Sequence, residues 1–297
     1  MVSIGTKADA TNYVAFLQAL KSAMPAGTTI SFTAPASFWY LRAFQIAEMA
    51  PLVDYVVYMT YDLHGQWDYG NEWSDPGCPG GNCLRSDVNL TETITALSMI
   101  TKAGVPANQI VVGVTSYGRS FQMTTAGCYT ELCTFTGPSS GAYAGLCTQT
   151  AGYISNAEID AIIAGNATMT DATGNSVSIS GTPYTYVDEN SNSNILVYDE
   201  TQWVGYMDDT IKASRASLYR GYNFLGTADW AVDLQSFSGD GGSNGESGGA
   251  IVSVSPSIWT SGNPSITCDP PCIFVLPPYP LGPVSYTHLT LPTKRIV

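Results

Sequence analysis

Three short segments carry side chains that could bind or act on a substrate, and each closes an apolar run. The first is Met59-Thr60-Tyr61-Asp62-Leu63-His64-Gly65 and the second is Ser116-Tyr117-Gly118-Arg119. The third is Ala228-Asp229-Trp230-Ala231-Val232-Asp233. Together they offer carboxylates, phenols, a guanidinium and an indole, which are groups that hydrogen-bond, pair with charges or present a flat apolar face.

Each segment on its own also has an ordinary structural interpretation. Asp62 could be a solvated carboxylate after an aromatic core strand, Arg119 could form a simple salt bridge, and Trp230 could be a core residue. At strand ends, Arg119 could instead hydrogen-bond a sugar, and Trp230 could form the floor beneath a sugar ring. The segments therefore carry functional meaning only as a set.

Up to residue 121 the elements that position these segments alternate between helix and strand. We expect helices near residues 9–24, with Asp9 or Thr11 as the cap, and near 41–49 and 90–102. Strands are expected at 29–34, 53–61 and 110–114. This order argues for parallel strands with helical crossovers, in either an open doubly wound sheet or part of a (β/α)8 barrel.

The pattern changes twice after residue 121. Residues 122–198 are interpreted as a small α+β insertion, whose short helix opens on the capping-box sequence Ser155-Asn156-Ala157-Glu158. The helix–strand alternation then resumes over residues 199–237. We expect a helix from about Thr201 to Tyr219 and a strand from Gly221 to Trp230. Residues 238–283 are expected to be a Gly/Ser/Pro-rich linker with a Cys268/Cys272 pair, and residues 284–297 resemble a translated sequencing adapter.

Composition narrows the class of protein and its partners. Only 12% of the 297 residues are charged, against about 25% in typical globular proteins. The net charge of −13, with no Lys/Arg cluster before the last few residues, excludes nucleic acid and anionic membranes as expected partners. A neutral substrate is compatible with this charge.

The cysteines and two sequons favour the secretory route. The cysteine spacings favour local disulfides over a zinc site, with close pairs at Cys78/Cys83 and Cys128/Cys133 and with Cys147 nearby. Asn89-Leu90-Thr91 and Asn166-Ala167-Thr168 are N-glycosylation sequons. The opening residues show no signal peptide, so an extracellular protein whose N-terminal segment is missing is expected.

Taken together, these motifs resemble family-18 glycoside hydrolases over residues 5–235. The resemblance rests on Met59-x-Tyr61-Asp62 at the sixth barrel strand, Tyr117-Gly118-Arg119 after the seventh, the insertion that follows, and Trp230-x-x-Asp233 at the eighth. The segment from Lys7 to Tyr13 and the cysteine-bearing loop resemble fungal class V chitinases of the killer-toxin-like branch. This implies the C-terminal half of a TIM barrel, with residues 1–121 carrying strands 5–7.

The resemblance also implies a mechanism without a metal or cofactor. In that family a Glu on the fourth strand protonates the glycosidic oxygen of chitin, and the N-acetyl group of the substrate attacks the anomeric carbon. Tyr61 and Asp62 would be the catalytic residues that this chain retains. The substrate-binding residues would be Met59, Trp67, Tyr117, Arg119 and Trp230.

One departure from the family is decisive for activity. The acidic motif D-x-x-D-x-D-x-E, which carries the general acid, occurs nowhere in these 297 residues. We therefore expect a part of a chitinase that keeps residues for binding chitin or N-acetylglucosamine oligosaccharides but is itself inactive. A non-catalytic chitin- or glycan-binding protein and an endo-β-N-acetylglucosaminidase remain alternatives.

Overall fold

The structure is a computed structural model that describes residues 6–73 and 77–236. The expected linker at 238–283, its Cys268/Cys272 pair and the tail at 284–297 lie outside the described residues. No helix in the described part of the chain is both long and apolar enough to cross a membrane.

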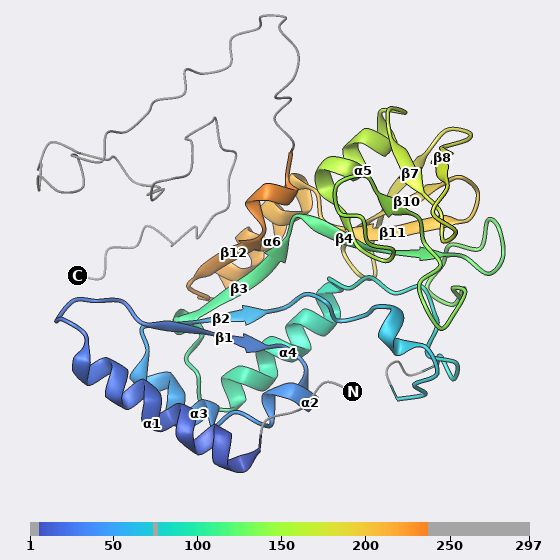
Figure 1. Cartoon of the computed structure of the whole chain (residues 1–297). Coiled ribbons are helices and arrows are strands. Elements are labelled where there is room, and N and C mark those ends of the chain that lie inside the picture. Colours follow the sequence, from blue (N-terminus) through green and yellow to red (C-terminus); the bar gives the residue numbers. More distant parts are fainter. Residues whose placement is uncertain (1–5, 74–76, 237–297) are drawn as a thin grey trace, which may run out of the picture.

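A four-stranded parallel sheet forms the first layer of the molecule (Figure 1). Its order is β1(Ser31–Pro35), β2(Tyr55–Met59), β3(Ile110–Thr115) and β12(Gly226–Trp230), and every neighbouring pair is parallel. Strands that follow one another in space in chain order are the pattern of a barrel, whereas a doubly wound sheet reverses its order. The expected half-barrel is therefore confirmed as a partial TIM-barrel-type fold, and the open doubly wound alternative is excluded.

Helices connect these strands and cover the outer face of the sheet. They are α1(Lys7–Ala23), α2(Phe38–Leu41), α3(Ile46–Met49), α4(Leu90–Lys102) and α6(Asp209–Gly221), with the short 3-10 turns Ala50–Leu52, Gln66–Asp68, Ala107–Gln109 and Val232–Leu234. In α4 the buried residues Thr93, Ala96, Leu97 and Ile100 form one stripe against the sheet. Burying each large aliphatic side chain stabilises the fold by about 1.5–3 kcal/mol.

The two edges of the sheet differ from its centre. All six residues of β3 are buried, whereas β1 alternates between exposed and buried positions. Phe32 and Ala34 of β1 join the core beneath the helices, and Ser31 and Thr33 face the other, open side. Among the described residues β1 and β12 each pair on one side only, so the sheet offers two edges to further strands.

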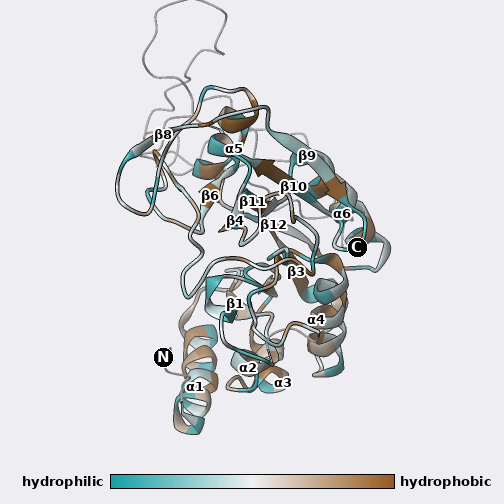
Figure 2. Ribbon diagram, turned by 90° about the vertical axis from the view of Figure 1, so that its right-hand side faces the viewer, coloured by the Kyte–Doolittle hydropathy of each residue, from teal (hydrophilic) through white to brown (hydrophobic). Residues whose placement is uncertain are grey.

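The insertion packs above the strand ends, as Figure 2 shows. Its five-stranded antiparallel sheet has the order β6-β4-β11-β10-β9, and a three-stranded sheet has the order β5-β7-β8. The strands are β4(Tyr117–Gln122), β5(Ala144–Gly145), β6(Ile154–Ser155), β7(Thr168–Thr170), β8(Ser176–Ser178), β9(Tyr184–Asp188), β10(Ser193–Tyr198) and β11(Gln202–Tyr206), with one helix, α5(Asn156–Ile163). β4 follows β3 after a single residue, so no loop separates the insertion sheet from the barrel strand.

Three details differ from the sequence expectations. The helix expected from about Thr201 begins at Asp209, because Gln202–Tyr206 form β11 and pair with β4. The helical stretch expected near 41–49 is two short helices. The first helix is capped by Thr6, with Asp9 as the reciprocal partner of the capping box, rather than by Asp9 or Thr11. The expected capping box of α5, Ser155 with Glu158, is confirmed.

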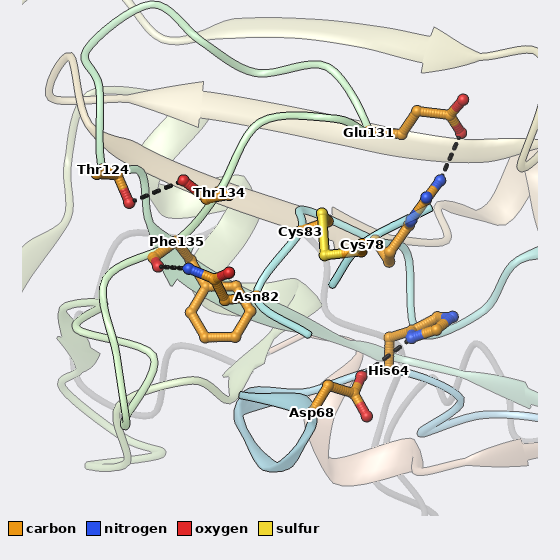
Figure 3. The surroundings of a disulfide bond; sticks show 10 residues. His64, Asp68, Cys78, Asn82, Cys83, Thr124, Glu131, Thr134 and Phe135 are labelled. Atoms are coloured by element: carbon orange, nitrogen blue, oxygen red, sulfur yellow. Dashed lines mark hydrogen bonds and ion pairs between the residues drawn. A yellow bond between two sulfur atoms is a disulfide. The ribbon is translucent and has the colours of Figure 1, made fainter. Parts of the chain in front are cut away.

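Two local disulfides fix the loops beside the strand ends. Cys78–Cys83 and Cys128–Cys133 each close a short loop, and Cys147 is a free, exposed thiol. Figure 3 shows how the Cys78–Cys83 loop docks on the insertion: the side-chain amide of Asn82 donates to the Phe135 carbonyl at 2.8 Å. The expectation of local pairs is therefore confirmed for these four cysteines.

The cysteine pattern predicts a simple labelling result. In the native, unreduced chain, iodoacetamide should alkylate Cys147, because an exposed thiol reacts and disulfide sulfurs do not. Peptide mass spectrometry should find Cys78, Cys83, Cys128 and Cys133 alkylated only after reduction. Protection of Cys147, or alkylation of any of the four without a reductant, would contradict these pairings.

Candidate active site

The carboxylate of Asp62 joins the barrel portion to the insertion. Asp62 follows β2 in the left-handed backbone region, at φ 55°, and its Oδ1 accepts three hydrogen bonds. The Tyr117 hydroxyl donates at 2.7 Å, and Nε and Nη2 of Arg119 donate at 2.9 and 2.8 Å. All of these contacts reach Oδ1, while the Asp62 side chain is 39% exposed, so Oδ2 can face a ligand.

Aromatic rings surround this ion pair. The Tyr61 ring lies edge-on to Tyr117 at 6.3 Å between centroids, and Tyr117 contacts Tyr153 at 4.6 Å. The Arg119 guanidinium lies 4.9 Å from the Trp67 ring and 5.1 Å from Tyr153. An arginine between aromatic faces is held in one orientation, which favours the charge-assisted hydrogen bonds to Asp62.

Tyr61 occupies space that a glycine leaves free. A Cβ on Gly113 of β3 would lie 2.7 Å from the Tyr61 ring, so only glycine accommodates the ring there. Burial raises the pKa of Tyr61 to about 12, with smaller contributions from Asp62 and Asp229. The Tyr61 hydroxyl therefore stays protonated at neutral pH and remains a hydrogen-bond donor.

The end of β12 brings Trp230 to the same face. Asp229 is held between the Ser116 hydroxyl, at 2.8 and 2.9 Å from its two oxygens, and Lys212, whose Nζ lies 2.9 Å from Oδ2. The Ser116 amide donates to the Trp230 carbonyl at 2.9 Å, and the peptide bond after Trp230 is cis. Trp230 is 58% exposed.

The predicted residues thus form a connected group, with differences between them. Direct contacts join Tyr61, Asp62, Trp67, Tyr117 and Arg119. Trp230 is tied to this group through its backbone, since its carbonyl accepts from the amide of Ser116, the residue before Tyr117. Met59 ends β2 opposite Pro35 and is half-buried. Sequence reasoning missed Tyr153, which lies in a loop of the insertion with no local motif to mark it.

A second carboxylate, Asp87, lies buried behind the pair. It is 0% exposed, and neither of its oxygens has a hydrogen-bond partner. Burial, followed by the negative charge of Asp62, raises the pKa of Asp87 to about 7, although the positive charge of Arg119 lowers it. Its carbonyl accepts from the Leu63 amide at 3.0 Å, which ties it to the residue after Asp62.

Asp87 predicts a pH-dependent stability. Its folded pKa of about 7 lies above the ordinary value of 3.8 for an aspartate, so the folded state holds this proton more tightly and loses stability as pH rises from about 4 to 7. The free energy of unfolding of Asp87→Asn, relative to that of the wild type, should therefore increase by up to about 4 kcal/mol as pH rises over this range. Denaturant unfolding between pH 4 and 8 measures this, with Asp209→Asn on the exposed start of α6 as control. The prediction would be refuted if the difference in unfolding free energy between Asp87→Asn and the wild type did not vary with pH.

The described residues show no group of three or more His, Cys, Asp or Glu side chains suited to hold a metal ion. The site itself offers the Asp62–Arg119 ion pair, several hydroxyl donors and exposed aromatic faces. That combination suits recognition of a neutral, polyhydroxylated ring.

Comparison with known proteins gives the family. Residues 3–235 match the model of glycosyl hydrolases family 18. The chain is 58% identical over 232 residues to "Probable chitinase LysM18" of Penicillium expansum, covering 77% of this chain and 15% of that protein. It is 33% identical over 222 residues to "Killer toxin subunits alpha/beta" of Kluyveromyces lactis, covering 75% and 17%. The chain thus spans a small part of the length of these relatives.

Solved structures show the same fold at low sequence identity. An Ostrinia furnacalis Group IV chitinase in complex with allosamidin superposes with a TM-score of 0.62 at 19% identity, covering 79% of this chain and 59% of that one. A class V chitinase of Nicotiana tobaccum in complex with NAG4 gives 0.59 at 17% identity, covering 77% and 61%. By its fold, its motifs and these matches, the chain belongs to glycosyl hydrolase family 18, in the fungal killer-toxin-like branch.

Proposed function

We propose that this chain supplies one substrate-binding wall of an enzyme that hydrolyses β-1,4-linked N-acetylglucosamine in chitin. The observation that carries the proposal is the Asp62–Arg119 pair, framed by aromatic rings at the carboxyl ends of parallel strands. The names of relatives in Penicillium expansum and the ligands of the solved chitinases support the same substrate class.

Each side chain has a role in the proposed substrate-assisted, retaining mechanism. The Tyr61 hydroxyl donates to the acetamido group whose carbonyl oxygen attacks the anomeric carbon, and Asp62 accepts a hydrogen bond through its free oxygen. Met59 packs beside the acetamido group. Trp230 lies beneath the sugar that is cleaved, and Tyr117 and Arg119 hold the neighbouring sugar. Trp67 stacks on the leaving-group side.

The general acid is proposed to come from outside these residues. Its D-x-x-D-x-D-x-E motif does not occur in the sequence, and none of the carboxylates in the described site replaces it by position. General acid catalysis contributes about 10²–10⁴-fold to such reactions. We therefore propose that this chain binds chitin oligosaccharides without hydrolysing them.

The missing acid also supports a second candidate, a protein that binds chitin or other glycans without cleaving them. The two candidates differ in the whole protein: an acidic motif on a neighbouring segment supports the hydrolase, and its replacement supports the binding protein. An endo-β-N-acetylglucosaminidase would share the site and would differ in releasing N-glycans from glycoproteins. We further propose an extracellular location, since the loops carry disulfides and one relative is named a secreted chitinase.

Titration with chitotetraose tests the proposal. We expect calorimetry to show binding to the 297-residue chain, and chromatography to show no shorter oligosaccharides after long incubation. Trp230→Ala should weaken binding by about tenfold, because a stacked ring contributes on the order of 1–2 kcal/mol. Tyr222→Ala is the matched control, since that exposed ring follows α6 at the opposite end of the sheet.

Two results would overturn the proposal. Hydrolysis of chitotetraose by this chain alone would show that it carries its own acid. Equal affinity of the wild type and Trp230→Ala would show that the aromatic floor at the end of β12 does not contact the sugar.

A further inference from the structure

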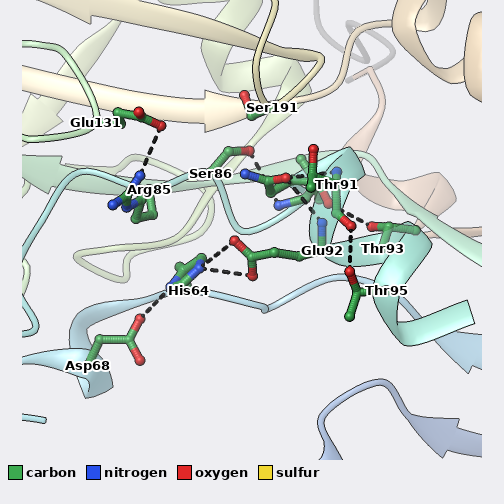
Figure 4. A network of polar contacts seen from close by, with 12 residues as sticks. His64, Asp68, Arg85, Ser86, Thr91, Glu92, Thr93, Thr95, Glu131 and Ser191 are labelled. Atoms are coloured by element: carbon green, nitrogen blue, oxygen red, sulfur yellow. Dashed lines mark hydrogen bonds and ion pairs between the residues drawn. The ribbon is translucent and has the colours of Figure 1, made fainter. Parts of the chain in front are cut away.

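A buried histidine joins two carboxylates from different elements beside the site. His64 is 4% exposed, and its Nδ1 lies 3.0 Å from Oδ2 of Asp68 (Figure 4). Its Nε2 lies 3.0 Å from both carboxylate oxygens of Glu92. Asp68 ends the short turn Gln66–Asp68, and Glu92 stands in the first turn of α4. His64 therefore links the loop after β2 to a helix of the barrel.

The histidine is a cation in this setting. Burial alone would lower the pKa of His64, but hydrogen bonds and charge interactions with Asp68 and Glu92 outweigh it and raise the pKa to about 10. At neutral pH the ring is an imidazolium that donates from both nitrogens. Removing it would leave the Asp68 carboxylate, whose side chain is 11% exposed, without its charge partner.

The same carboxylate closes the turn that carries Trp67. Oδ2 of Asp68 also accepts from the Gly65 amide at 3.1 Å, and the Asp68 amide donates to the Gly65 carbonyl at 3.0 Å. The Trp67 ring folds back over Gly65, where an added Cβ would lie 2.3 Å from it. The position of the ring therefore follows the geometry of a turn that is fixed through Asp68.

Trp67 in turn meets the candidate site. Its ring lies 4.9 Å from the Arg119 guanidinium, which pairs with Asp62, and it is 47% exposed. One part of the ring thus contacts the ion pair, and the exposed part can face a ligand. A chain of contacts runs from Glu92 through His64 and Asp68 to Trp67 and Arg119.

We propose that His64 is a positioning residue for Trp67. The His64 ring anchors the Gly65–Asp68 turn to α4, so that the Trp67 indole faces a bound sugar beside the Asp62–Arg119 pair. The inference rests on the proposed function only for the identity of the ligand. The anchoring itself is a property of the chain without any ligand. His64 acts through Trp67 and does not touch the substrate.

A double-mutant cycle with chitotetraose tests the proposal. His64→Gln and Trp67→Ala should each weaken binding by about tenfold, and the double variant should lose no more than either single variant. Glu131→Gln is the matched control, because it removes the Arg85–Glu131 ion pair of the adjacent loop and should leave the affinity unchanged. Additive losses, or wild-type affinity in His64→Gln, would overturn the proposal.

A second readout needs no ligand and separates this proposal from the proposed function. The fluorescence of Trp67 is obtained by subtracting the emission of the Trp67→Phe variant in the same background. Acrylamide should quench this Trp67 fluorescence more strongly in His64→Gln than in the wild type. Unchanged quenching would overturn the anchoring role even if chitotetraose binds. Increased quenching in a chain that binds no chitotetraose would keep the anchoring role and refute only the proposed function.

If His64→Gln does not fold, Glu92→Gln tests the same link. The Glu92 side chain is 42% exposed, so its neutral form is tolerated more readily than a change at the buried ring. We expect it to increase Trp67 quenching in the same direction, by a smaller amount. Quenching equal to wild type in a folded Glu92→Gln variant would count against anchoring to α4.

Discussion

The ion pair between Asp62 and Arg119 is the interaction on which the arrangement of this site depends. Asp62 stands at the end of a barrel strand and Arg119 on the first strand of the insertion, so the pair spans two layers of the molecule. Their geometry is reinforced by the Tyr117 hydroxyl and by rings on either side of the guanidinium. A partly buried, three-fold hydrogen-bonded carboxylate is costly to disturb, which makes this corner rigid.

The rest of the candidate site is arranged around that corner by two further polar clusters. Lys212, Ser116 and Asp229 hold the end of β12, and with it Trp230. His64, Asp68 and Glu92 hold the loop that carries Trp67. Both clusters place a cation beside a largely buried carboxylate, so the two exposed indoles stand on rigid supports rather than on free loops.

The sequence could predict that these strand-end residues lie close together, because strand ends in parallel sheets gather at one face; their roles toward a substrate stay a proposal. Asp62, Arg119 and Trp230 are far apart in the chain, yet an alternating pattern of strands and helices is enough to bring them together. The strand β11 was missed because Gln202–Tyr206 are all buried and show no alternation, although the N-cap Asp208 marks the start of α6 in the sequence. Asp87 gives no local signal: its burial, and the charges of Asp62 and Arg119 that act on its pKa, arise only in the tertiary structure.

We propose that Asp62 and Arg119 act as one unit in binding an N-acetylglucosamine oligomer. A double-mutant cycle of Asp62→Asn and Arg119→Gln, with the affinity for chitotetraose measured by calorimetry, tests it most directly. The expected coupling energy is about 1–3 kcal/mol, because each change removes the same charge-assisted contact. Independent losses that add within about 0.3–0.5 kcal/mol would contradict it.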